Sequence, residues 1–144
     1  MKYLGILLVI FSFSTYALKA QVDVSWMQLE RIEYELRDES GSGFSLPIPK
    51  FSNEIKNLEG KKVRVKGFVI PLNIEGTEYA ISAYPNASCF FCGSAGQESV
   101  MRLTLKDKRV KYNVDEFLEF EGELQLNYLP DDLMYALEGS VEVK

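Results

Sequence analysis

The chain has 144 residues, of which 21 are acidic and 16 are basic, so its formal net charge is −5. A surface of that sign repels phosphate backbones, which disfavours nucleic-acid binding. The chain contains two cysteines and no histidine, so catalysis that depends on a histidine general base is excluded.

The first 20 residues have the organisation of a secretory signal peptide. A short basic start at 1–3 precedes an uncharged apolar run at 4–13, and small residues then allow cleavage before Leu18 or Gln21. The run is shorter than the about 20 residues of a membrane span, and no cysteine follows it that could carry a lipid anchor. A buried strand or a signal anchor is the alternative. We expect 1–20 to be a signal peptide and the mature protein to be periplasmic or secreted, without a membrane span.

We expect residues 21–50 to form an N-terminal extension and linker. Apolar and charged residues alternate at 31–37, which predicts a strand at a sheet edge. The glycine- and serine-rich stretch 39–43 predicts a flexible turn, and 46–49, with its two prolines, predicts an extended linker. We expect Trp26 to pack on the domain that follows.

We expect residues 51–144 to form one β-barrel domain. It begins with a short helix over 52–60, which starts at a serine cap and ends at a glycine. In the strand predicted over 61–72, the apolar residues change from odd to even positions at Gly67. Such an exchange of faces predicts a bulge or bend at this glycine, which would let one long strand serve two sheets.

Four shorter strands are predicted where apolar and polar residues alternate, namely 79–83, 101–105, 117–126 and 135–143. In the last of them, one face is predicted to carry Tyr135, Leu137, Gly139, Val141 and Val143. A long bent strand followed by four shorter ones is how a small Greek-key barrel of the OB type closes. The predicted fold class is therefore mainly β, a five-stranded Greek-key barrel of OB type with a short helix and an N-terminal extension. A five-stranded sandwich is the alternative.

Three stretches carry a resemblance to known proteins. They are SWMQL at 25–29, LEGKKVRVKGFVIPL at 58–72, and AYP at 83–85 with the cysteine-bearing loop after it. Together they resemble a bacterial exported family of domains of unknown function, over nearly all of the mature chain. The resemblance implies an OB-like exported domain, a link to metal handling or envelope transport, and no established catalytic activity. Many members have a proline-rich, histidine-containing loop where this chain has CFFCGSAGQES at 89–99, so a histidine ligand proposed there has no counterpart here.

The two cysteines, Cys89 and Cys92, are three positions apart. An oxidising compartment favours a disulfide between them, although so small a ring stabilises by only roughly 2 kcal/mol. As metal ligands they are accompanied by no histidine and no third cysteine, which excludes a complete structural zinc site within one copy. Two thiolates suit a soft ion such as Cu(I), with Met101 nearby, or zinc completed by Glu98 or a second subunit.

A thiol-disulfide oxidoreductase is a further alternative. That chemistry needs a helix N-terminus or cations beside the reactive thiolate. Glycines at 93 and 96 argue against a helix after the second cysteine, and no Lys, Arg or His lies between Gly76 and Val100. The sequence therefore favours this chemistry less than metal binding or a local disulfide.

The rest of the loop offers contact residues. Phe90 and Phe91 are adjacent, so in an extended segment one would face the barrel and the other the solvent; Tyr84 and Glu98 extend that surface. No Gly-x-Ser-x-Gly elbow and no phosphate loop occurs, so an enzyme is not expected unless the thiols act. We expect a binding module that takes up a transition metal (Cu or Zn), an envelope partner or a small ligand through the Cys89–Cys92 loop. If the cysteines form an inert disulfide, the domain would be structural instead.

Overall fold

The computed structural model describes residues 21–38, 41, 43, 45–129 and 132–144. The predicted signal peptide at 1–20 lies outside the described residues, as does part of the predicted turn at 39–43. Within the described ranges, no helix is long and apolar enough to cross a membrane.

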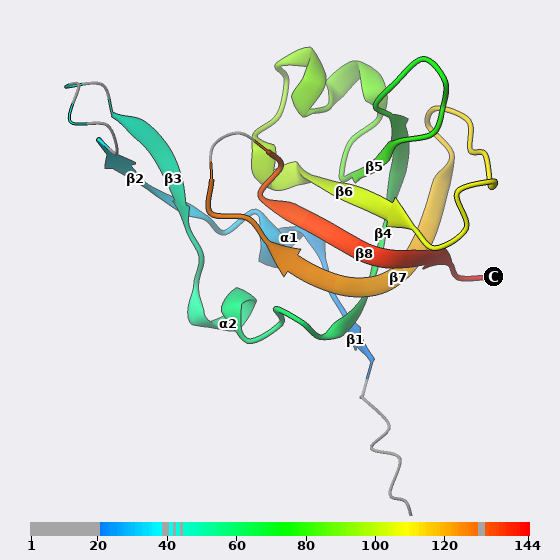
Figure 1. Ribbon diagram of the computed structural model, residues 1–144, viewed down its shortest axis with the longest axis horizontal. Helices are drawn as coiled ribbons and strands as arrows, with labels where there is room; N and C mark the ends of the chain where they lie inside the picture. The colour runs from blue at the N-terminus through cyan, green and yellow to red at the C-terminus, as the bar shows by residue number, and fades with distance from the viewer. Residues whose placement is uncertain (1–20, 39–40, 42, 44, 130–131) are drawn as a thin grey trace, which may run out of the picture.

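A closed barrel of five strands forms the body of the protein (Figure 1). Its strands are β4 (Lys62–Pro71), β5 (Tyr79–Ser82), β6 (Val100–Leu105), β7 (Phe117–Leu126) and β8 (Tyr135–Glu142). They follow one another around the barrel in the order β4-β5-β6-β8-β7, and β7 pairs with β4 to close it. All these neighbours are antiparallel except β6 and β8, which are parallel. The predicted mainly β fold is confirmed at this level.

Few and short helices accompany the barrel. They are α1 (Trp26–Leu29), α2 (Asn53–Lys56) and three 3-10 turns, η1 (Asn86–Ser88), η2 (Phe90–Cys92) and η3 (Gln97–Ser99). The predicted helix near 52–60 is present as α2 and begins as expected, because Ser52 Oγ accepts a hydrogen bond from the Ile55 main-chain N–H. It is shorter than predicted, since it ends at Lys56 with Asn57 as its C-cap, and Gly60, with a positive φ of 70°, lies beyond its end. The short strand β1 (Val22–Asp23) runs parallel to β4 outside the barrel.

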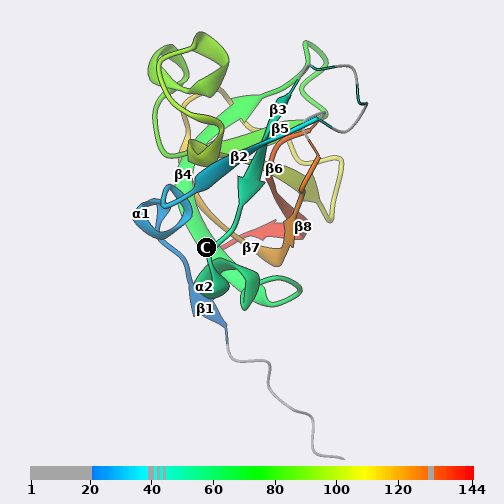
Figure 2. The same ribbon diagram turned by 90° about the vertical axis from the view of Figure 1, so that its left-hand side faces the viewer.

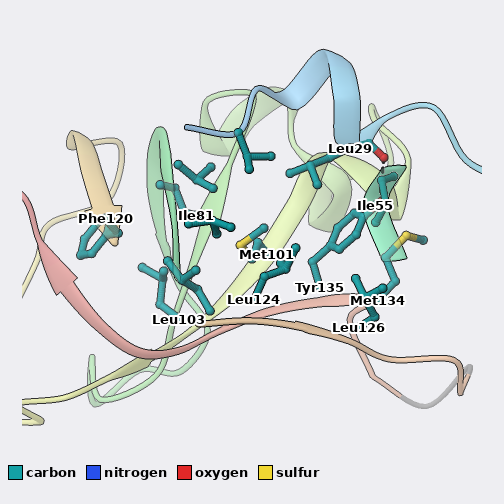
Figure 3. Close-up of a cluster of buried hydrophobic side chains, with 14 of the residues drawn as sticks. Leu29, Ile55, Ile81, Met101, Leu103, Phe120, Leu124, Leu126, Met134 and Tyr135 are labelled. Carbon is teal, nitrogen blue, oxygen red and sulfur yellow. Dashed lines mark hydrogen bonds between the residues drawn. The ribbon is translucent and has the colours of Figure 1, made fainter. Parts of the chain in front are cut away.

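The barrel interior holds the main core (Figure 3). The even positions of β7 are apolar, and three of them, Phe120, Leu124 and Leu126, are buried there, as the alternation predicts. The Tyr135 hydroxyl donates a hydrogen bond of 2.8 Å to the Leu29 carbonyl, which joins α1 to the barrel. The N-terminal segment thus covers one end of the core.

The predicted exchange of faces at Gly67 is wrong. β4 pairs with β7 from Lys62 to Phe68 without a register shift, and the odd positions Val63, Val65 and Val69 all enter the main core. Gly67 has a different role, because a Cβ at this position would lie 2.4 Å from the Ser82 carbonyl oxygen. The glycine allows β5 to approach where β4 changes partner from β7 to β5.

The predicted alternation of the last strand fails after Leu137. Gly139 has a positive φ of 58°, and β8 bulges there, so that two of its residues oppose one of β7. Consequently Ser140 takes the inward place and is 1 % exposed, while Gly139 is exposed. A bulge of this kind reverses the parity of the residues that follow it.

The segment before the barrel differs from the predicted linker. Residues 46–50 form β3 (Leu46–Lys50), which pairs antiparallel with β2 (Glu33–Arg37). The strand predicted near 31–37 is therefore present, but it belongs to a separate two-stranded ribbon and not to the barrel sheet. The ribbon lies beside the barrel in Figure 1 and in front of it in Figure 2.

Candidate functional site

The cysteine-bearing loop connects β5 to β6 and covers the outside of the barrel wall (light green in Figure 1). β5 is buried on both faces, which explains its weak alternation. Its outward face joins a second, smaller core made of Ile70, Ala80, Cys89, Val100 and Leu133. Cys89 is thus a packing residue of this second core, with 0 % of its surface exposed, whereas Cys92 is exposed.

Both sulfur atoms converge on one carbonyl oxygen. The Cys89 Sγ lies 3.1 Å from the Asn86 main-chain oxygen, and the Cys92 Sγ lies 2.9 Å from the same atom, so both thiols donate to it. The turn that brings them together is closed by a hydrogen bond from the Gly93 N–H to the Phe90 carbonyl, and Gly93 adopts a left-handed φ of 74°. A glycine favours that conformation. The loop is therefore folded so that two thiols face one point.

The start of the loop is held by Asp115, which precedes β7. The Asn86 main-chain N–H donates to a carboxylate oxygen of Asp115 at 2.6 Å, and the Asp115 N–H donates to the Val69 carbonyl. Asp115 has a positive φ of 63°. Asn86, whose carbonyl oxygen both thiols meet, is thereby linked to β4 through its own N–H and Asp115.

The surroundings do not activate the Cys92 thiol. Partial burial raises the pKa of Cys92 above its usual value, and the neighbouring Cys89 raises it further. No basic residue occurs between Gly76 and Val100 to oppose this shift, and a 3-10 turn, not an α-helix, holds Cys92. At neutral pH the Cys92 side chain is therefore a thiol, unlike the thiolates of disulfide oxidoreductases.

The two cysteines are free thiols in this structure. The disulfide between Cys89 and Cys92 stays a prediction, because it depends on the redox conditions that the protein meets. For the described part of the chain, no group of three or more cysteine, aspartate and glutamate side chains is placed to hold a metal ion. A metal at this loop would have two protein sulfurs.

The further metal ligands considered from sequence lie elsewhere. Met101 lies among the side chains of the main core (Figure 3). Cys89 belongs to the second core instead. Because adjacent residues of a strand face opposite sides, Val100 rather than Met101 meets the cysteine loop. Glu98 accepts a hydrogen bond of 2.8 Å from the Tyr34 hydroxyl of β2. Met101 is therefore not a ligand.

The predicted contact residues divide between packing and exposure. Phe90 packs against the second core, and Phe91 is 47 % exposed, with the two ring centroids 5.3 Å apart. Phe90 thus faces the barrel and Phe91 faces the solvent. Tyr84 is also exposed.

A pocket of about 410 Å³ lies beside the loop. Tyr84 and Glu98 line it together with Glu30, which follows α1, and with serines of the loop. The charge of Glu30, followed by burial, raises the pKa of Tyr84 above its usual value. Neither Glu30 nor Tyr34 was predicted as a site residue, because nothing in the local sequence places them near residues more than fifty positions away.

Comparisons with known proteins give little. No family model and no curated protein matches the chain. Among solved structures, the chain is similar to the crystal structure of a DUF3299 family protein from Pseudomonas aeruginosa, with 15 % identity, a TM-score of 0.49, and coverage of 87 % of this chain and 97 % of that one. A similarity of this size assigns neither a family nor a function, so the resemblance to an exported bacterial family stays a prediction.

Proposed function

We propose that the protein is an exported binding module in which the Cys89–Cys92 loop holds one soft metal ion, Cu(I), between two thiolates. The single observation that supports this most is the convergence of the two Sγ atoms on the Asn86 carbonyl oxygen, at 3.1 and 2.9 Å. Two sulfurs that already point at one atom need little rearrangement to share one ion. The start of the loop is already fixed by its hydrogen bond to Asp115. Metal binding therefore loses little free energy in ordering it.

The choice of Cu(I) follows from the number and kind of donors. Thiolates select soft ions such as Cu(I), for which a low coordination number is acceptable, whereas structural zinc is nearly always held by four ligands. Among the described residues, no third cysteine, aspartate or glutamate side chain is placed to complete a site with the two sulfurs. Zinc would require ligands from a second subunit, and a stoichiometry of one ion for two chains would reveal it.

Binding would proceed from the exposed side of the loop. Cys92 is accessible and Cys89 is buried, so the ion meets Cys92 first and Cys89 second. The balanced step is Cu(I) plus two thiols giving a two-coordinate dithiolate complex and two released protons. The two S–H hydrogen bonds to Asn86 are lost, and two metal–sulfur bonds replace them.

The finer fold assignment belongs to the same proposal. The strand order β4-β5-β6-β8-β7, the closing pair β7–β4 and the parallel pair β6–β8 support a Greek-key barrel of OB type. Barrels of this type commonly bind ligands through their loops. We propose the boundaries 1–20 for a signal peptide, 21–50 for the N-terminal extension and 51–144 for the barrel domain, with a periplasmic or secreted location.

Titration of the reduced protein with Cu(I), without oxygen and against a coloured Cu(I) chelator, tests the proposal. We expect one ion per chain, with thiolate-to-copper absorption in the ultraviolet. Cys89→Ser and Cys92→Ser should each abolish this stoichiometric binding. Met101→Leu is the matched control, because it removes the methionine sulfur nearest the loop in sequence while conserving volume in the main core. It should bind as the unmodified protein does.

Three results would decide against the metal. Unchanged binding in Cys92→Ser would remove the dithiolate site. If the protein binds no Cu(I) but turns over in a disulfide-reduction assay, the oxidoreductase is favoured. If it neither binds Cu(I) nor turns over, and the two cysteines are bridged, an inert disulfide is favoured.

A further inference from the structure

The outer edge of β2 is open. In the ribbon, Tyr34 lies opposite Pro49 and Leu36 lies opposite Pro47. Because proline has no N–H to donate, these are the pairs in which antiparallel strands exchange no hydrogen bonds. The main-chain N–H and C=O groups of Tyr34 and Leu36 therefore point away from β3. Across the described residues, no hydrogen bond outside the ribbon uses those groups.

No other long strand edge competes with this one in the described part of the chain. The barrel is closed by the β7–β4 pair, and β1, outside it, has two residues. The outer edge of β3 carries prolines, so it cannot donate there. All five residues of β2 are exposed, and Leu36 is 76 % exposed. An added strand would therefore extend the ribbon at β2.

The acidic pocket adjoins this edge. The Tyr34 hydroxyl donates to Glu98, whose carboxylate lines the pocket of about 410 Å³ together with Glu30 and Tyr84. None of the residues that line this pocket is basic, and no ion pair of the described residues includes Glu30 or Glu98. Two carboxylates beside an aromatic ring attract a positively charged group.

We propose that the β2 edge binds an extended segment of a partner protein, which pairs its main chain with Tyr34 and Leu36 and places a lysine or arginine side chain in the pocket. Strand addition supplies affinity through the main chain, and a side-chain pocket supplies the preference for sequence. This interaction is independent of metal binding at Cys89 and Cys92.

The charges along β2 favour a different protein over a second copy. If two copies paired antiparallel with Tyr34 opposite Leu36, the two Glu35 side chains would lie directly opposite each other. Like charges in that position destabilise a strand pair. A segment with basic residues meets no such repulsion at this edge.

The probe is a capped peptide of seven alternating lysines and valines. It is titrated into the reduced, metal-free protein while the main-chain amide signals of the protein are followed by NMR. We expect the amide signals of Tyr34 and Leu36 to shift. Leu36→Pro deletes one outward N–H, so it should bind the peptide about five- to tenfold more weakly, the size expected for one hydrogen bond. Leu36→Ala is the matched control, since it keeps the N–H and should bind as before.

The charge of the pocket is tested separately. Glu98→Gln keeps an acceptor for Tyr34 but removes the charge, and it should weaken binding, whereas Glu59→Gln, at an exposed position after α2, should not. A peptide of alternating glutamates and valines should not bind. The proposal is overturned if the lysine peptide leaves the Tyr34 and Leu36 signals unmoved, if Leu36→Pro binds as tightly as Leu36→Ala, or if both peptides bind equally.

Discussion

The two cysteines should contribute unequally to stability, although both sulfurs face the same oxygen. Cys89→Ala removes a sulfur atom from the second core, where Cys89 is 0 % exposed and packs with Ile70, Ala80 and Val100. Deleting a buried atom of this size costs about 0.8 kcal/mol of transfer free energy, and the cavity left behind adds to it. We expect a loss of about 1–2 kcal/mol in the free energy of unfolding.

Cys92→Ala provides the comparison within the same loop. Cys92 is exposed, so its removal should change the free energy of unfolding by less than about 0.5 kcal/mol. Urea unfolding of both variants under reducing conditions measures the difference, with the midpoint shifting and the slope unchanged. If Cys92→Ala destabilises as much as Cys89→Ala, then the division into one packing thiol and one accessible thiol is wrong.

Three further expectations concern pH and packing. The raised pKa of Cys92 keeps its side chain protonated at neutral pH, so the ion must displace a proton. The apparent affinity for Cu(I) should therefore rise with pH, by up to about tenfold per pH unit for each proton displaced. Titrations at several pH values measure this dependence, and an affinity that does not change with pH would contradict it. Tyr135→Phe removes the buried 2.8 Å hydrogen bond to α1 and leaves the Leu29 carbonyl unpaired. The free energy of unfolding, measured with urea, should fall by about 1–3 kcal/mol, and an unchanged value would mean that the bond is not formed. Gly67→Ala places a Cβ 2.4 Å from the Ser82 oxygen and should cost at least about 1–3 kcal/mol; a variant as stable as the parent would refute the close approach of β4 and β5.

Sequence patterns predicted those elements that have one buried and one exposed face. β7 follows strict alternation because its even positions enter the core and its odd positions face the solvent. The N-cap of α2 could be predicted for a local reason, since Ser52 bonds the main chain only three residues further on. These signals do not depend on which distant segments the chain meets.

The errors arise where distant contacts decide. Gly67 was interpreted as a change of face, but it is required by the close approach of Ser82 from another strand. The bulge at Gly139 depends on how β8 meets both β6 and β7. The prolines of β3 were interpreted as a linker because their tolerance in a strand depends on which pairs they occupy.

The candidate site divides in the same way. Cys89 and Cys92 are close in sequence, so their pairing could be proposed from spacing alone. Their unequal exposure could not be predicted, because it results from the second core that β5 and β6 form with the loop. Glu30, which lines the pocket, comes from a segment that no local pattern connects with the cysteine loop.

Copper K-edge X-ray absorption of the reduced protein loaded with one equivalent of Cu(I) would identify the atoms that hold the ion. We expect a first coordination shell of two sulfur atoms, which disappears in Cys89→Ser and in Cys92→Ser. A shell of nitrogen or oxygen atoms, or a two-sulfur shell that survives either substitution, would contradict it.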